Sequence, residues 1–450
     1  IEAVEGSAPA YRGTAYLVFE DLELERFGNR IPQINAEVFR QAEDRPAGPE
    51  HAPPLSELVE GVALSPGTGE FALEPRVARY VFEGGGTQAA NVNSSGCKPD
   101  MLVALDQLKG ELPACGHVAL VVSWFGDDLR AGHCRVEPRC EEPDRDALPE
   151  PWSVAGLTTS TARLVGRDSG GRPVYGGTPS DASVIGAIRE MKARGLKVLL
   201  YPFLLMDVPP DNTLPDPWTG GTGQPPYPWR GRITTELAPG LPGTTDQTAA
   251  AAGEVDAFFG TATAGDFTVS EDTVAYAGPE EWTWSRFALH LAALGAASGG
   301  VDSIVIGTEL RALTQIRSAR TTYPMVDRLI GLAAEVRALL PEALISYAAD
   351  WSEYFGHQPG DGTGDRIFHL DPLWADPNID FVAIDDYLPL SDWRHEGPNA
   401  DRDAGHPSGW SLPYLKSNVE GGEHYDFYYA SDADRRAQIR TPIEDAAGAD

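Results

Sequence analysis

The chain has 450 residues and a large excess of acidic side chains, with 67 Asp and Glu against 35 Lys and Arg and a formal net charge of −32. This length allows two or three domains with ample core. So acidic a surface repels nucleic acid and anionic membranes, which argues against a sequence-reading DNA-binding protein. The charge fits either solubility in salt water or an acidic channel through which DNA slides without binding, and composition favours neither.

Signals for targeting or membrane insertion are not found in the sequence. No apolar stretch approaches the roughly 20 residues that span a bilayer, and the acidic first residues lack the apolar core of a secretory signal. The sequence does not begin with methionine, and its first methionine is Met101. We therefore expect no transmembrane segment, and we expect either a processed product or an internal piece of a longer protein.

The first part of the chain has the pattern of a β-rich segment. Residues 15–19 form a compact apolar run and residues 34–39 alternate in polarity, and both patterns are typical of strands. A stretch rich in Pro and Gly over residues 51–69 predicts loops, and a short helix is expected over residues 101–109. We place a domain boundary here, with a β-rich segment over residues 1–110 and a second domain over residues 111–450.

From His117 onward, expected strands and helices alternate, which is typical of parallel α/β folds. The expected strands cover residues 118–124, 197–206, 301–309, 344–348 and 379–384, with one more possible near 154–157. The expected helices cover residues 181–194, with Ser180 as N-cap, and residues 246–259, 281–297 and 326–336. A closed (β/α)8 barrel needs eight strands. The sequence therefore predicts a TIM-barrel-like domain that is incomplete within this chain, or alternatively an open, partial α/β sheet.

Four cysteines occur in one part of the chain, at Cys97, Cys115, Cys134 and Cys140. Their even number permits two disulfides, which an extracellular or virion setting would allow. Neighbouring histidines also suggest zinc, but their spacing matches no familiar ligand set. We expect these cysteines to be buried or paired, and we expect no metal site.

Carboxylates follow the ends of the expected strands. Glu309 comes after the apolar run 304–306, which predicts a strand covered on both faces. The other carboxylates in such positions are Asp127, Asp128, Asp207, Asp350, Asp385 and Asp386. Barrel active sites lie at the carboxyl ends of the strands, and glycoside hydrolysis needs two carboxyl groups, about 5 Å apart for retention or about 6.5–9.5 Å for inversion. Glu309, Asp385 and Asp386 are therefore the candidate catalytic residues, although each can instead cap the helix that follows.

Aromatic residues accompany these carboxylates. Ring faces are a common way to hold sugars, although aromatic residues also fill cores and interfaces. The loop from Asp207 to about Thr245 is dense in Pro and Gly, and loops longer than about 12–15 residues are usually functional or disordered. We expect an ordered rim or docking surface there. The candidate substrate-binding residues are Trp124, Asp207, Trp229, Asp350, Trp351 and Tyr387.

Motifs for other chemistries are missing from the sequence. It contains no Walker-type phosphate loop, no His-Glu-x-x-His and no Gly-x-Ser-x-Gly. We therefore expect no cofactor.

Several longer motifs resemble a known family of phage tail proteins. Near the start, Tyr11-Arg-Gly-Thr-Ala-Tyr-Leu-Val-Phe-Glu-Asp-Leu22 and Phe27-Gly-Asn-Arg-Ile-Pro-Gln33 are similar to the tail-hub segment of long-tailed phages. The segments similar to an adjoining TIM-barrel-like domain are Trp124–Arg135, Tyr201–Pro210, Ala349–Pro359 and His369–Phe381. Together they resemble the baseplate hub, or megatron, protein of gene transfer agents and siphophages, a family often labelled glycoside hydrolase/phage tail protein.

The resemblance implies a structural role at the tail tip of a virion that contacts the bacterial surface. It implies contacts with other baseplate and distal tail proteins, a homo-oligomer in the form of a trimer, and a host surface glycan as a possible ligand. The family's barrel continues beyond a point like Asp450, through a Thr-Glu strand end that would match a hydrolase nucleophile. The glycosidase pattern also has Asn before the acid, where this chain has Thr308.

Two functions follow from these observations. The first is a structural baseplate hub whose barrel binds a glycan or a partner protein. The alternative is an active glycoside hydrolase that degrades cell wall or capsule, with Glu309 as general acid and Asp385, Asp386 or a residue outside this sequence as its partner. A freely secreted enzyme is disfavoured, because the start resembles a tail hub and no signal precedes it.

Overall fold

The computed structural model describes residues 55–65, 69–94, 96–387, 389–420, 425 and 427–442. The chain divides into two compact units, Ile1–Pro53 and Pro54–Asp450, and the described residues all belong to the second. The strands that we expect over residues 15–19 and 34–39 lie outside the described residues.

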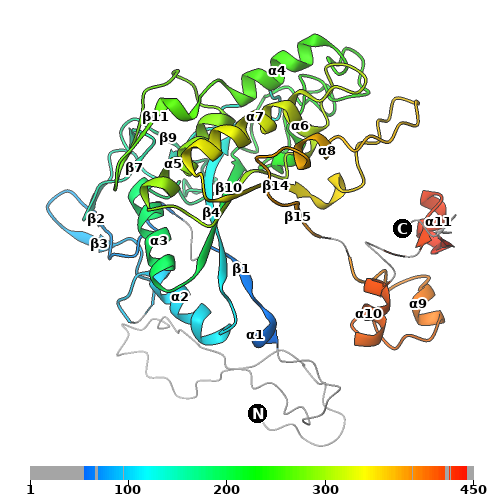
Figure 1. Cartoon of the computed structure of the whole chain (residues 1–450), viewed down its shortest axis with the longest axis horizontal. Coiled ribbons are helices and arrows are strands. Elements are labelled where there is room, and N and C mark those ends of the chain that lie inside the picture. Colours follow the sequence, from blue (N-terminus) through cyan, green and yellow to red (C-terminus); the bar gives the residue numbers. More distant parts are fainter. Residues whose placement is uncertain are drawn as a thin grey trace, which may run out of the picture. The chain divides into compact units, whose positions relative to one another are not determined.

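Six strands of the described part form one parallel sheet, in the order β1-β4-β10-β13-β14-β15 (Figure 1). These strands are β1 (Gly61–Leu64), β4 (His117–Gly126), β10 (Lys197–Met206), β13 (Ser303–Thr308), β14 (Leu344–Asp350) and β15 (Ala383–Asp385). The sheet curls like part of a barrel, and helices lie between successive strands along the chain. The fold is therefore α/β and TIM-barrel-like, as predicted.

The longest strand, β10, shows how the sequence builds this sheet. Its residues alternate between fully buried side chains such as Val198 and Leu200 and half-buried ones such as Tyr201 and Phe203. Leu200 packs against Gly295 of the helix α5 (Trp284–Ala297), so the fully buried set faces the helices. Because side chains alternate across a strand, Tyr201 and Phe203 face the other side of the sheet, toward the inside of the curl.

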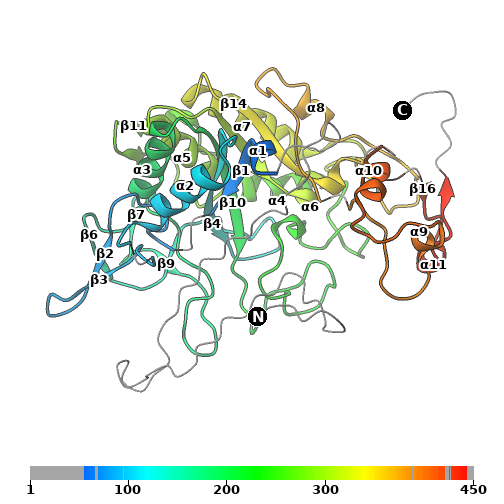
Figure 2. The same ribbon diagram turned by 90° about the horizontal axis from the view of Figure 1, so that it is seen from below.

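The helices cover the outer side of the sheet. In Figures 1 and 2, α3 (Asp181–Ala193), α5 and α7 (Pro324–Leu339) lie along one side of β4, β10 and β14. Ser180 caps α3 as predicted, since its side chain accepts a hydrogen bond from the Ser183 N–H. The other helices are α1 (Leu55–Leu58), α2 (Asp100–Glu111), α4 (Ala249–Phe259), α6 (Arg311–Thr314), α8 (Asp371–Trp374), α9 (Ala400–Asp403), α10 (Leu412–Glu420) and α11 (Asp432–Ala437).

The remaining regular elements are short. β2 (Arg79–Val81) and β3 (Thr87–Ala89) join β6 (Asp146–Leu148) in an antiparallel sheet, in keeping with the expected β-rich start. The other strand pairs are β5 (Arg139–Cys140) with β9 (Arg163–Leu164), β7 (Ser153–Val154) with β8 (Leu157–Thr158), β11 (Phe267–Val269) with β12 (Val274–Tyr276), and β16 (Phe427–Tyr428) with β17 (Thr441–Pro442). The 3-10 helices are η2 (Arg230–Arg232), η3 (Ala264–Asp266) and η4 (Trp351–Glu353).

Three local predictions were wrong. The stretch 51–69 was expected to be loops, but β1 lies within it and pairs with β4, because Val62 and Leu64 pack on the core. The possible barrel strand near residues 154–157 is instead the antiparallel pair β7–β8, reversed by Ala155 and Gly156 with positive φ. The last strand covers only the end of the apolar run 379–384.

The expectation that the cysteines are buried or paired is wrong for Cys97 and holds for the other three. All four cysteines are free thiols; Cys97 is exposed and the other three are buried. Among the described residues, none of the helices combines the length and apolar character that a bilayer-spanning helix requires.

A buried arginine anchors the long loop that follows β10. Arg317 is 2% exposed, and its guanidinium Nη2 lies 2.6 Å from Asp246 Oδ2, near the end of the loop. Its Nη1 lies 2.9 Å from Asp361 Oδ2 in the segment after η4. Through Arg317, these contacts join the end of the loop to the segment after η4.

We predict that Arg317→Ala lowers the free energy of unfolding by about 3–5 kcal/mol, because it leaves the buried Asp246 without its cation. Denaturant titration of the full chain measures this. Arg320→Ala is the matched control, since it removes a solvent-exposed bidentate pair with Asp365 and should change the free energy little. Equal effects of the two substitutions would contradict this account.

Candidate active site at the strand ends

Glu309 lies immediately after β13 in a sparsely populated backbone conformation. Its φ is 48°, in the left-handed region that side chains other than glycine seldom adopt. The regular pairing of β13 with β14 shifts between Val305 and Thr308, and the Glu309 N–H then donates to the carbonyl of Ala348 over 2.8 Å. Such strain persists where surrounding contacts fix it and often marks functional sites.

Two residues of the long loop hold the Glu309 side chain. The indole Nε1–H of Trp229 donates to Glu309 Oε2 over 2.7 Å, and Arg230 Nη2 lies 3.0 Å from the same oxygen. The Arg230 Nε–H also donates to the Thr308 carbonyl over 2.8 Å, and its guanidinium lies 3.9 Å from the ring centre of Phe203. Glu309 therefore binds the loop and does not cap α6, whose N-cap, Leu310, has no side-chain cap.

Asp385 lies at the end of β15, in register with Asp350 at the end of β14. The hydroxyl of Tyr201 donates a short hydrogen bond to Asp385 Oδ2. Partial burial raises the pKa of Asp385; the Tyr201 hydrogen bond opposes this, and the negative charge of Glu309 adds to it. Burial is also the main reason why the pKa of Tyr201 is raised.

Tyr387 and Asp386 follow Asp385 at the surface. Tyr387 is 68% exposed, and the charge of Glu309 is the largest cause of its raised pKa. Its hydroxyl is thus within electrostatic reach of Glu309, while Asp386 is exposed. The structure therefore brings Trp229, Glu309 and Asp385 together at one edge of the sheet, with Tyr387 beside them.

Asp350 and Trp351 lie next to this group, but Asp350 has a capping role. Its carboxylate accepts the backbone N–H of Ser352 over 3.0 Å at the start of η4. The alternative that the sequence left open, a carboxylate that caps the next helix, thus holds here. Trp351 is half-buried and its ring contacts Phe355.

Two other sequence candidates have different surroundings. Asp207 follows β10 at the same edge, but its Oδ2 lies 2.6 Å from Arg139 Nη1 and accepts the Gly166 N–H over 2.7 Å. Trp124 is 1% exposed and stacks on Phe287 of α5, with 4.8 Å between ring centres. Its side chain therefore lies in the core on the helix side of the sheet.

Sequence reasoning missed two polar members of the site. Tyr201 was seen only as one of many aromatic residues, although the alternation of β10 could have placed it on the inner face. No pattern in the sequence predicts the role of Arg230. Its contacts with the end of β13 depend on how the long loop folds, since Arg230 and Thr308 are 78 residues apart in the chain.

Comparison with known proteins connects this edge to a family. Residues 282–450 match the model of the GTA TIM-barrel-like domain. The matched GTA TIM-barrel-like segment contains Glu309, Asp385 and Tyr387, whereas Tyr201, Trp229 and Arg230 come from residues before it. No curated protein matches the sequence.

Solved structures show only distant similarity to the chain. The alignment with a GH113 β-1,4-mannanase complex covers 72% of this chain and 63% of the mannanase, at 15% identity and a TM-score of 0.31. The alignment with a second GH113 β-1,4-mannanase covers 68% of this chain and 60% of the enzyme, at 15% identity and a TM-score of 0.31. The alignment with the GH113 β-mannanase from Alicyclobacillus acidocaldarius covers 69% of this chain and 58% of the enzyme, at 15% identity and a TM-score of 0.29. The chain thus spans about three fifths of the length of these enzymes, and such low TM-scores carry no inference about it.

The described residues contain no group of three or more His, Cys, Asp or Glu side chains placed to hold a metal ion. The functional groups that meet on this edge are carboxyl, hydroxyl, indole and guanidinium groups. A carboxyl group with a raised pKa beside a second carboxylate is the arrangement that separates an acid from a base in many active sites.

We predict opposite shifts in the pKa of Asp385 from two substitutions. Tyr201→Phe removes a hydrogen bond that stabilises the charged form, so the pKa should rise further. Glu309→Gln removes a neighbouring negative charge, so the pKa should fall. Titration of the Asp385 carboxyl carbon by NMR measures both. Shifts of the same sign, or no shift in either variant, would show that these groups do not meet as described.

Proposed function

We propose that the chain is part of a structural hub protein at the tail tip or baseplate of a siphophage-like particle or gene transfer agent. The observation that carries this proposal is the match of residues 282–450 to the GTA TIM-barrel-like domain. In this proposal the protein is located in the virion tail, contacts other baseplate and distal tail proteins as a homotrimer, and organises host attachment and envelope penetration. The expected tail-hub character of residues 1–110 supports the same assignment.

We further infer that the group of Trp229, Glu309, Asp385 and Tyr387 binds a glycan of the bacterial surface. Tyr387 and Trp229 expose ring surface, at 68% and 37% exposed, and such faces match the apolar faces of sugar rings. The adjacent carboxylates and the Tyr201 hydroxyl offer hydrogen bonds to sugar hydroxyls. Trp351, Asp350 and Asp207 lie along the same edge of the sheet.

The alternative, glycoside hydrolysis, is favoured by one observation. The raised pKa of Asp385 suits a general acid. Glu309 would then be its partner rather than the acid, since its Oε2 already accepts from Trp229 and forms an ion pair with Arg230. Asp386, the other candidate for the partner carboxylate, is exposed at the surface. We rank binding above catalysis, because contacts that lock a carboxylate in place serve recognition without requiring turnover.

We predict that Tyr387→Ala weakens binding of the chain to purified bacterial peptidoglycan about 5–10-fold, through the loss of one stacking face. Co-sedimentation with the insoluble glycan measures the affinity. Tyr428→Ala is the matched control, because Tyr428 is also exposed but belongs to β16, and it should bind like the unchanged chain. If neither substitution weakened binding to peptidoglycan, the proposed glycan site would be contradicted.

We predict that Glu309→Gln leaves particle assembly intact, because the residue lies at the sheet edge and its isosteric amide still accepts the Trp229 N–H. Deletion of the gene should instead abolish tails, and electron microscopy of purified particles shows both outcomes. Tailed particles after the deletion would refute the structural role. Release of reducing ends from cell wall by the unchanged chain, lost in Glu309→Gln, would instead establish the hydrolase.

A further inference from the structure

The backbone just after Glu309 is held from inside the sheet by a tyrosine. Tyr347 lies in the middle of β14 and is fully buried. Its hydroxyl oxygen accepts the N–H of Leu310, the residue that follows Glu309, over 2.9 Å. This hydrogen bond fixes the strained turn at Glu309, because the N–H of the next residue can no longer rotate away from β14.

One buried carboxyl group completes this arrangement. The Tyr347 hydroxyl lies 3.2 Å from Glu353 Oε2, to which it can donate, and the same oxygen accepts the backbone N–H of Asp350 over 2.8 Å. Glu353 Oε1 accepts from the hydroxyl of Thr314. Glu353 thereby contacts the ends of two neighbouring strands, one through Tyr347 and one directly.

We propose that Glu353 and Tyr347 are positioning residues that set Glu309 and Asp350 relative to each other at the strand ends. Neither contacts a ligand in this role; they act through the backbone of Leu310 and Asp350. The inference goes beyond the proposed function, since it holds whether the edge of the sheet binds a glycan, cleaves one or docks a protein.

The ionisation of Glu353 makes this role measurable. Burial raises the pKa of Glu353 to about 7, against the opposing effect of its three donors. The other charged or titratable groups around it are Asp350, Tyr347 and His369, with Arg311 and His357 beyond His369, and with Arg366 and Asp371 in the lining of an adjacent cavity. Burial lowers the pKa of His369 to about 3 and that of His357 to about 4. Both histidines are therefore neutral between pH 6 and 8, where Glu353 changes charge.

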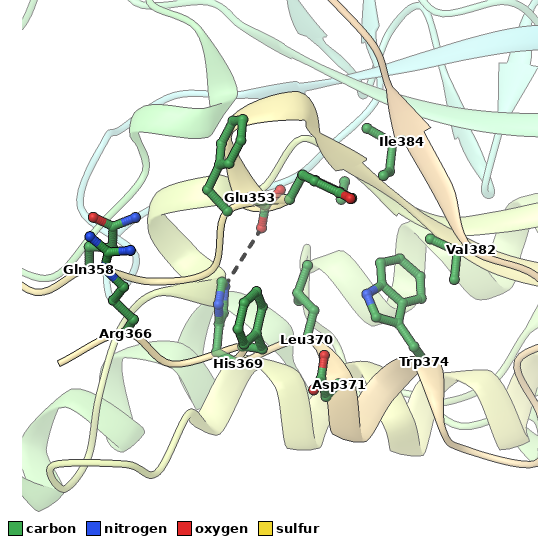
Figure 3. A pocket seen from close by; sticks show the side chains of 13 residues that line it. Glu353, Gln358, Arg366, His369, Leu370, Asp371, Trp374, Val382 and Ile384 are labelled. Atoms are coloured by element: carbon green, nitrogen blue, oxygen red, sulfur yellow. Dashed lines mark ion pairs between the residues drawn. The ribbon is translucent and has the colours of Figure 1, made fainter. Parts of the chain in front are cut away.

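Glu353 borders a cavity on the outer face of the sheet. It measures about 480 Å³, and Glu353 and His369 line it together with Trp374, Val382 and Ile384 (Figure 3). His369 Nε2 lies 4.0 Å from Glu353 Oε1, but the neutral ring is a polar neighbour and not an ion-pair partner at neutral pH.

The indole resonance of Trp229 reports the position of Glu309, because its N–H donates to Glu309 Oε2. In NMR spectra of the full chain, assigned with Trp229→Phe, we expect Tyr347→Phe to shift this resonance upfield, toward that of a solvent-exposed indole. Tyr323→Phe is the matched control. It also removes a hydroxyl from a buried tyrosine, but one that contacts His357 Nδ1 over 3.0 Å and not Leu310.

A second experiment follows the Trp229 indole resonance from pH 6 to pH 8. Ionised Glu353 is the stronger acceptor and orients the Tyr347 hydroxyl so that its lone pairs meet the Leu310 N–H. We therefore expect one inflection near pH 7 in the unchanged chain and none in Glu353→Gln, which stays neutral. This pH titration also tests the proposal if the Tyr347→Phe variant fails to fold.

Two results would overturn the proposal. One is an equal shift of the Trp229 resonance in Tyr347→Phe and Tyr323→Phe, which would mean general loosening of the core. The other is an inflection near pH 7 that persists in Glu353→Gln. Neither result depends on glycan binding, so failure of the proposed function leaves this test unaffected.

Discussion

The site depends on the parallel pairing of β10, β13, β14 and β15. Parallel strands in register end at the same edge of a sheet, so four segments far apart in sequence deliver their last side chains to one place. Asp350 and Asp385 are direct register partners there, and Glu309 follows the strand beside them. A shift of one residue in any of these strands would turn its inner side chains toward the helices.

The loop after β10 converts this edge into a site with defined chemistry. Through Trp229 and Arg230 it supplies the donors that fix Glu309, and its far end is anchored by Arg317. The two carboxylates of the site consequently have different surroundings. Glu309 is held by an ion pair and an indole, whereas Asp385 is half-buried beside a tyrosine hydroxyl and under the influence of Glu309's charge.

Much of this arrangement could be read from the sequence, because it depends on local periodicity. The apolar runs gave β4, β10, β13 and β14 and their helices, and strand ends gave Glu309 and Asp385. β1 was missed, since four residues among prolines and glycines carry too weak a pattern. The sequence alone could not show whether the Trp124 ring lies on the helix side or on the inner side of the sheet, because this depends on the register of β4. Arg230 and Glu353 were beyond reach, because their partners are set by tertiary folding.

The whole site requires that the long loop and the end of β13 meet at Glu309. A double-mutant cycle between Trp229→Phe and Glu309→Ala, measured on the free energy of unfolding, tests this contact most directly. We expect a coupling energy of about 1.5–3 kcal/mol for this partly buried hydrogen bond to a carboxylate. Additive effects of the two substitutions would contradict it, because the loop would then not contact Glu309.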